Sequence, residues 1–199
     1  MLLSNFTSTN EKVMVNKEYL DSFEEKVMNE LLRLCTSYKA LDNILLATDD
    51  IDARWDTLAP EYIADAVKEI ANYPTVAVAW AAYLGMAVAH EWDKDWESYR
   101  NKEYKSYYGA QGFDDMDENI LFNVLKMNPE SKEAKDREEM MRRCAQMCIT
   151  LIRHEHIEPQ SPTAFYAYAK VAKTMFRIGA AIELKQLGYK FEKVNLPKC

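Results

Sequence analysis

The sequence predicts an all-α protein, an antiparallel bundle of four long helices and two short ones in a single domain over residues 1–199. The 199 residues include only 5 Gly and 6 Pro, too few for the turns of a multi-stranded sheet. Helix-favouring Ala, Leu, Met, Glu and Lys are abundant. Apolar residues also recur at intervals of three and four, the spacing that lines one helix face.

The first long helix is expected over residues 17–46. Its apolar face would comprise Leu20, Phe23, Val27, Leu31, Leu34, Tyr38, Leu41 and Leu45. Residues 48–56 lose this period and are expected to form a loop. Residues 1–16 are expected to form a peripheral N-terminal arm.

Prolines mark the expected starts of the next helices, because proline is well tolerated in the first turn. Pro60 would begin a short helix that ends near residue 72, and Pro74 the second long helix, over about 74–107. A second short helix is expected over 114–127, where several acidic residues would favour the positive end of the helix dipole.

Two more long helices complete the expected bundle. One spans 130–157, with Asn128 as its cap, and the other spans 162–187, with Ser161 as its cap. Gly188 then ends the last helix, and residues 189–199 are expected to lie as a peripheral tail.

The helix over about 74–107 is expected to be central, because Val76 to Ala89 are apolar nearly all round. Small residues stand four apart along it, at Ala77, Ala81, Gly85 and Ala89. The last helix carries a matching cluster at Gly179, Ala180 and Ala181. Since glycine inside a helix costs about 1 kcal/mol relative to alanine, we expect the two helices to touch at Gly85 and Gly179.

The charge balance disfavours a nucleic-acid partner. The chain has 25 basic and 32 acidic residues, a net charge of −7, and residues 1–100 alone have 9 basic and 18 acidic side chains. Lys170, Lys173 and Arg177 share one helix face, which we interpret as a solvated face.

We expect a cytoplasmic protein without a membrane segment. The first ten residues lack the basic and apolar regions of a signal peptide. The longest apolar stretch, Val76 to Ala89, is shorter than the roughly 20 residues that span a bilayer.

The cysteines and histidines predict neither a metal nor another cofactor. Cys35, Cys144, Cys148 and Cys199 lack the paired close spacings of a zinc site, and we expect reduced core thiols. The Glu-x-x-His motif of di-iron bundles is absent, since Ala87 precedes His90 and Leu151 precedes His154 by three residues.

His90, Glu91 and Asp93 are the candidate catalytic residues. His90 ends a buried apolar run, and an imidazole near carboxylates is the usual material of proton transfer. The alternative is a structural histidine at a helix exit with solvated acids around it.

The candidate ligand-binding residues are Tyr83, Trp92, Trp96, Tyr99 and Glu183. Trp92, Trp96 and Tyr99 form one helical stripe that would either line an aromatic cleft or pack into the core. Glu183 interrupts the apolar face of the last helix, and a buried carboxylate would need a partner, for which His90 or Tyr83 is favoured over Arg177. The alternative places Glu183 in water at the edge of that face.

Two functions remain open. The first is a non-enzymatic helical protein that binds a protein partner or forms a homodimer, because catalytic motifs are missing and the aromatic, acidic segment 91–108 is expected to be exposed. The second is a small-molecule or metal-dependent enzyme around His90. A carboxylate within hydrogen-bond reach of His90, in an apolar pocket, would favour the enzyme.

Overall fold

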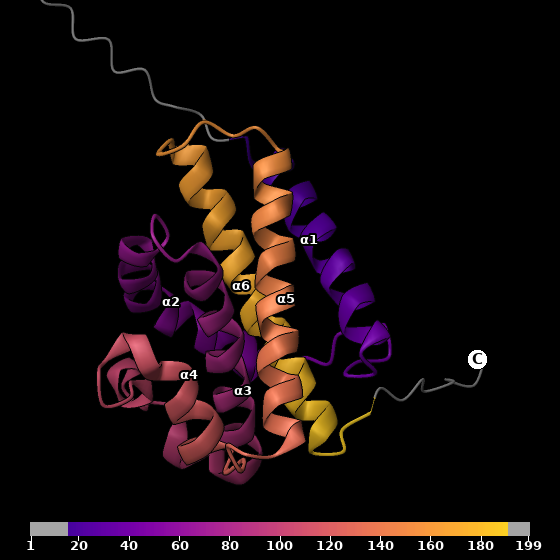
Figure 1. Ribbon diagram of the computed structural model, residues 1–199, viewed down its shortest axis with the longest axis vertical. Helices are drawn as coiled ribbons and strands as arrows, with labels where there is room; N and C mark the ends of the chain where they lie inside the picture. Colours follow the sequence, from indigo (N-terminus) through magenta and orange to yellow (C-terminus); the bar gives the residue numbers. More distant parts are fainter. Residues whose placement is uncertain (1–15, 191–199) are drawn as a thin grey trace, which may run out of the picture.

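The computed structural model describes residues 16–190, and within this range it is all-α with no strand, as predicted (Figure 1). The antiparallel order expected for the four long helices remains a prediction. The long elements are α1 (Lys17–Ser37), α2 (Asp49–Glu69), α3 (Pro74–Tyr99), α5 (Lys132–His154) and α6 (Pro162–Gln186). The short elements are η1 (Tyr104–Tyr107), η2 (Phe113–Asp115), α4 (Met116–Glu118) and the π-helical η3 (Asn119–Val124).

The first helix is shorter than predicted because α1 ends at Ser37. Lys39 and Asn43 have positive φ angles of 61° and 58°, which a continuing helix does not allow. Leu41 lies in the loop that follows α1, and its side chain is nevertheless buried. The apolar pattern therefore continues beyond the end of the helix.

The loop predicted over 48–56 is wrong, as is a helix start at Pro60. The Thr48 hydroxyl caps α2 by accepting the Ile51 N–H at 3.2 Å, and three aspartates occupy the favourable first turn. Ile51 and Trp55 begin the buried face of α2. Pro60 therefore lies inside the helix.

The remaining helices also begin or end at residues other than those predicted. The helix predicted over 74–107 corresponds to α3, which ends at Tyr99, and Asp95 interrupts it with extended backbone. Asp95 also accepts the Ser98 N–H at 3.3 Å, which caps the helical turn that follows. The helix expected over 114–127 is divided between α4 and η3. Ser131, rather than Asn128, caps α5. The predicted cap at Ser161 is confirmed, and Gly188 follows α6 with a positive φ, as suits the glycine predicted to end this helix.

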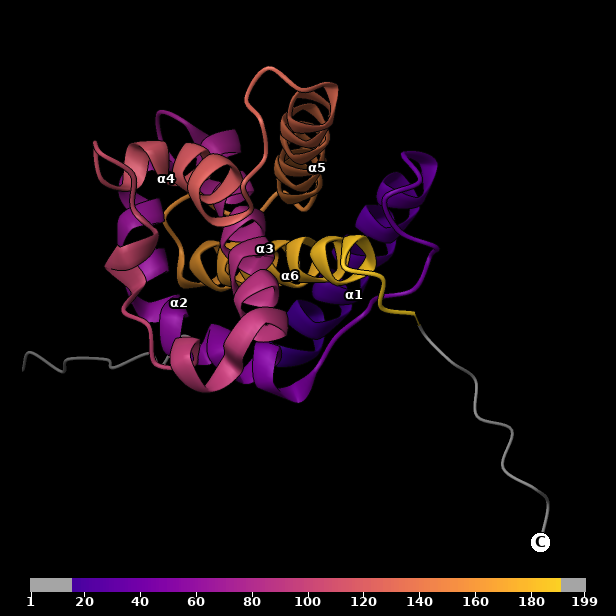
Figure 2. The same ribbon diagram turned by 90° about the horizontal axis from the view of Figure 1, so that it is seen from below.

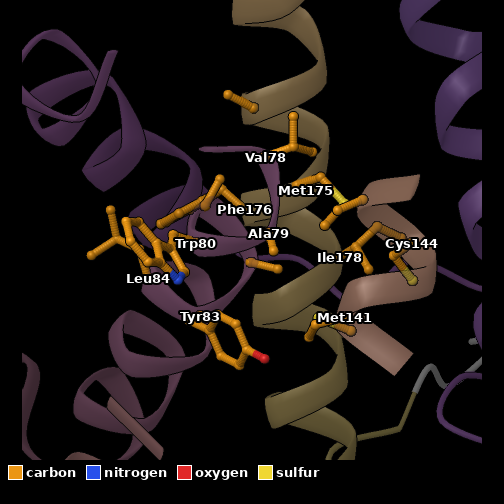
Figure 3. Packing of buried hydrophobic residues seen from close by; sticks show 14 of the residues in the cluster. Val78, Ala79, Trp80, Tyr83, Leu84, Met141, Cys144, Met175, Phe176 and Ile178 are labelled. Atoms are coloured by element: carbon orange, nitrogen blue, oxygen red, sulfur yellow. The ribbon is translucent and has the colours of Figure 1, made fainter. Parts of the chain in front are cut away.

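The prediction of a central helix is confirmed. Residues 77–89 of α3 are all buried, and α3 contacts α2, α4, η3, α5 and α6. Figure 2 shows α3 and α6 crossing, with α2 and α4 on one side and α1 and α5 on the other. Figure 3 shows the apolar side chains packed around this crossing.

The predicted contact at Gly85 and Gly179 is also confirmed. A Cβ atom added to Gly85 would lie 1.9 Å from the carbonyl oxygen of Phe176. One added to Gly179 would lie 1.9 Å from the carbonyl oxygen of Ala82. The backbones of α3 and α6 therefore touch directly at their crossing.

Three of the cysteines are free and buried, as predicted, namely Cys35, Cys144 and Cys148. The Sγ atoms of Cys35 and Cys144 are 3.7 Å apart. Cys199, most of the predicted tail, and all but one residue of the predicted N-terminal arm lie outside the described residues. In the part that is described, no helix has both the length and the apolar character to cross a membrane.

Candidate functional site

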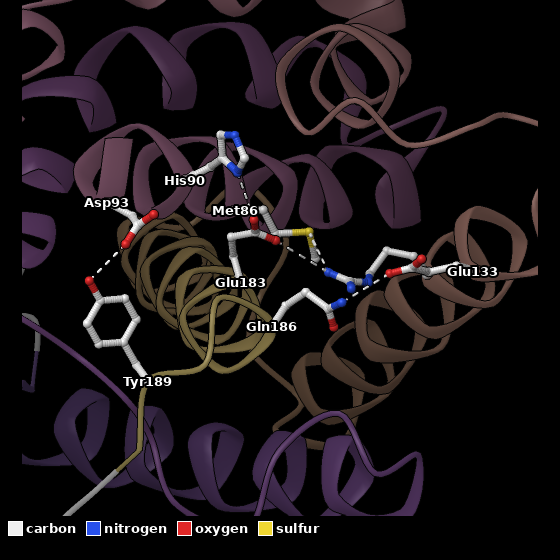
Figure 4. A network of polar contacts seen from close by, with 8 residues as sticks. Met86, His90, Asp93, Glu133, Glu183, Gln186 and Tyr189 are labelled. Atoms are coloured by element: carbon white, nitrogen blue, oxygen red, sulfur yellow. Dashed lines mark hydrogen bonds and ion pairs between the residues drawn. The ribbon is translucent and has the colours of Figure 1, made fainter. Parts of the chain in front are cut away.

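His90 contacts Glu183 where the buried run of α3 ends. Its Nδ1 lies 2.9 Å from Oε1 of Glu183 (Figure 4). The side chain of His90 is 27% exposed and that of Glu183 only 6%. The expectation that a buried Glu183 pairs with His90 is confirmed, and the alternative of Glu183 in water is wrong. Arg177 pairs instead with Asp52 at 3.1 Å.

Arg137 of α5 is the third member of this group, and sequence reasoning missed it. The residue is 7% exposed, and its Nη1 lies 3.9 Å from Oε2 of Glu183 and 3.7 Å from the sulfur of Met86. We call His90, Arg137 and Glu183 the buried polar network. The sequence contains a sign that Arg137 is buried, because its position falls on the buried stripe of α5. The other residues of this stripe include Ala134, Met141, Cys144 and Cys148.

The buried polar network orients the imidazole. Because the carboxylate of Glu183 accepts a hydrogen bond, we assign the proton to Nδ1 of His90, which leaves the lone pair on Nε2. Figure 4 shows the second ring nitrogen pointing away from Glu183. An imidazole held in this way can accept a proton as a general base.

Glu91 and Asp93 do not join His90. Glu91 is buried, but it pairs with Lys102 and accepts the Tyr107 hydroxyl at 2.6 Å. The exposed Asp93 accepts the Tyr189 hydroxyl at 2.8 Å. Each predicted catalytic carboxylate therefore has its own partner away from the imidazole.

The aromatic stripe does not form an exposed surface. Trp92 and Trp96 are partly buried and pack against the core, and the Trp92 indole donates to Asp50 at 3.3 Å. Tyr99 lies 5.8 Å from the ammonium of Lys102, measured to the ring centroid. The expectation that segment 91–108 is exposed is confirmed for its acidic residues other than Glu91, but it is wrong for its aromatic residues, which are buried or partly buried.

Tyr83 lines a separate cavity of about 270 Å³ between α3, α4 and α5, which we call the Tyr83 cavity. Val76, Ala79 and Trp80 supply apolar walls, and Asp117 and Glu138 supply carboxylates. Burial raises the pKa of Asp117 above its ordinary 3.8. Tyr83 and Glu183 therefore belong to different sites, although both were predicted to bind a ligand.

A groove lies between the loop after α1 and the end of α6. Two adjoining hollows of about 240 and 280 Å³ share Leu46, Tyr189 and Lys190, and we call them the Tyr189 groove. Ile44 lines one of them and is 42% exposed, and Tyr189 is 40% exposed. Large apolar side chains are therefore open to solvent here.

Residues 16–190 contain no group of three or more His, Cys, Asp or Glu placed to hold a metal ion. Comparison of the chain with protein-family models, with curated proteins and with solved structures finds no match in any of the three. The sites described above are therefore interpreted from their own chemistry.

Proposed function

We propose that this chain is a non-enzymatic, cytoplasmic helical protein that forms a homodimer through the Tyr189 groove. The observation that carries the proposal is the exposure of Ile44 and Tyr189 on one apolar groove. Burying such side chains against a partner is favourable in proportion to the apolar area removed from water. The free thiols of the buried cysteines suit a reducing compartment.

A second copy suits this groove in two ways. A two-fold dimer places the same surface on both subunits, so that Ile44 and Tyr189 of each copy are covered together. The groove itself has charges of both signs, because Asp42 lines it together with Lys185 and Lys190, so Asp42 of one copy can face a lysine of the other.

The mass in solution tests the proposal. Light scattering after gel filtration should give a dimer for the wild type and a monomer for Ile44→Asp, which places a charge in the interface. Val67→Asp is the matched control, because Val67 is 43% exposed on α2. A monomeric wild type, or a dimeric Ile44→Asp, would contradict the proposal.

A second candidate, an enzyme that uses His90 as a general base, is favoured by the 2.9 Å contact between His90 and Glu183. Glu183 would fix the tautomer and orientation of the imidazole, and Arg137 would balance the charge of the carboxylate. Nε2 would then accept a proton from a substrate or from an attacking water.

Hydrolysis of p-nitrophenyl acetate, a general probe of reactive imidazoles, tests this candidate. The wild type should exceed the rate of free imidazole, and His90→Gln should lose most of that excess. His154→Gln is the control, because His154 is exposed at the end of α5. Equal rates for the wild type and His90→Gln would contradict a reactive Nε2 lone pair on His90, on which this candidate depends.

A further inference from the structure

The side chain of Tyr83 is almost entirely buried and lines the Tyr83 cavity. Tyr83 is 4% exposed, and among residues 16–190 its hydroxyl makes no hydrogen bond to another side chain. Figure 3 shows the hydroxyl directed away from Trp80, toward the side where Met141 of α5 lies. Because Tyr83 lines the cavity and its hydroxyl is not used by another side chain, this hydroxyl is available to a molecule there.

The carboxylates of the cavity also have no cationic partner among the described residues. Neither Asp117 nor Glu138 forms an ion pair there, although Asp117 is partly buried. Arg142 lines the cavity too, but its Nε lies 3.0 Å from Glu139, outside the cavity lining. The cavity thus combines two carboxylates that form no ion pair in the described part of the chain, Asp117 and the exposed Glu138, with an exposed arginine that shares Glu139 with Arg143.

The rest of the lining is apolar and aromatic. Val76 and Ala79 form part of it, together with the indole of Trp80. The Trp80 ring packs edge-on against Phe113, with centroids 4.4 Å apart, which fixes its orientation. Such walls accept an alkyl chain, and an aromatic ring also attracts a cation.

We propose that the Tyr83 cavity binds a small primary alkylammonium ion. The ammonium group donates hydrogen bonds to the carboxylate of Asp117 and to the hydroxyl oxygen of Tyr83, and Glu138 adds a second negative charge. The alkyl chain lies against Val76, Ala79 and Trp80. A volume of about 270 Å³ suits a chain of a few carbons. An anion is disfavoured by the two carboxylates.

Titration with n-butylamine at neutral pH, where the amine is protonated, tests this site. Nitrogen–proton NMR spectra should show saturable shifts that include the indole N–H of Trp80. n-Butanol has the same chain without the charge and should bind at least about tenfold more weakly. No saturable shift, or equal binding of n-butanol, would overturn the proposal.

Variants locate the binding. Asp117→Asn should weaken n-butylamine binding about tenfold, because it removes the charged acceptor. Asp114→Asn is the matched control, since Asp114 is an exposed neighbour outside the cavity lining, and it should bind as the wild type does. Unchanged binding by a folded Asp117→Asn would overturn the assignment.

A parallel titration identifies the source of the amine. The ammonium could belong to a free metabolite or to a lysine side chain of another protein. Tighter binding of n-butylamine than of Nα-acetyl-lysine amide supports a free amine, and the reverse order supports a lysine side chain. Either order supports the cavity as an ammonium site, which holds whether or not the chain forms a dimer.

Discussion

Nδ1 of His90 and Oε1 of Glu183 lie 2.9 Å apart, although the two residues are 93 positions apart in the sequence. His90 lies about one helical turn beyond Gly85, and Glu183 lies about one turn beyond Gly179. These two glycines are the positions at which α3 and α6 touch. The close approach of the two backbones therefore brings the imidazole to the carboxylate.

The buried polar network should be sensitive to loss of its carboxylate. Glu183→Gln leaves the guanidinium of Arg137 buried without a negative partner, and we expect the free energy of unfolding to fall by about 3 kcal/mol. Urea denaturation measures this loss. Glu61→Gln is the control, because Glu61 is exposed on α2, and it should change stability by less than about 0.5 kcal/mol.

A second substitution tests whether the loss comes from the unpaired charge. In an Arg137→Met background, Glu183→Gln should cost clearly less than in the wild type, because no buried guanidinium is left behind. Equal costs in the two backgrounds would show that Arg137 and Glu183 are not coupled.

The backbone contact should not accept a methyl group. Gly179→Ala would place Cβ 1.9 Å from the carbonyl oxygen of Ala82, so α3 and α6 must separate. We expect a loss of about 3 kcal/mol, despite the gain of about 1 kcal/mol in helix propensity. Calorimetry or urea denaturation measures the difference.

Gly188→Ala separates this clash from the general effect of replacing glycine. Gly188 has no atom near its added Cβ, and its φ of 98° should cost an alanine about 1 kcal/mol. A Gly179→Ala variant that is no less stable than Gly188→Ala would argue against the close contact.

The carboxyl of Asp117 should make stability depend on pH. Burial raises its pKa in the folded state, so its contribution to stability is greatest below the ordinary pKa of 3.8 and falls as pH rises through the folded-state pKa. Asp117→Asn removes this effect and should be more stable than the wild type at pH 7. Melting curves across pH should show the gain disappearing below about pH 3.8. A less stable variant at pH 7 would contradict the desolvation of Asp117.

The buried thiols should be unreactive in the folded protein. The neighbouring Cys35 thiol and burial raise the pKa of Cys144, and burial raises the pKa of Cys148. Because the thiolate is the reactive form, a disulfide reagent such as DTNB should modify Cys35, Cys144 and Cys148 only after unfolding. Peptide mass mapping distinguishes them from Cys199, and rapid native labelling of any of the three would contradict their burial.

The central helix was predictable because its signal is local. The apolar run over 76–89 predicts a helix that is buried on all sides. The glycines at 85 and 179 predict a close approach of the two helices that contain them. The start of α2 was missed because Pro60 was interpreted as a first-turn residue. The Thr48 cap and the Asp49, Asp50 and Asp52 side chains of the first turn outweigh the hydrogen bond that an interior proline loses.

The candidate sites were only partly predictable. His90 and Glu183 were identified because each interrupts or ends an apolar run, but Arg137 required the same test to be applied to α5. The surroundings of Tyr83 depend on where α4 lies, and a periodic pattern does not give this position. Asp117 is one of the acidic residues expected at the start of the helix over 114–127, and it was not predicted to line a site with Tyr83.

The account depends on α3 being the innermost helix, since that position places both His90 and Tyr83. Native-state hydrogen exchange of the amides of residues 77–89 tests this most directly. We predict that these amides exchange only through global unfolding, with a free energy of opening equal to that of unfolding. Exchange through local opening, at a free energy close to that of the helix ends, would contradict the account.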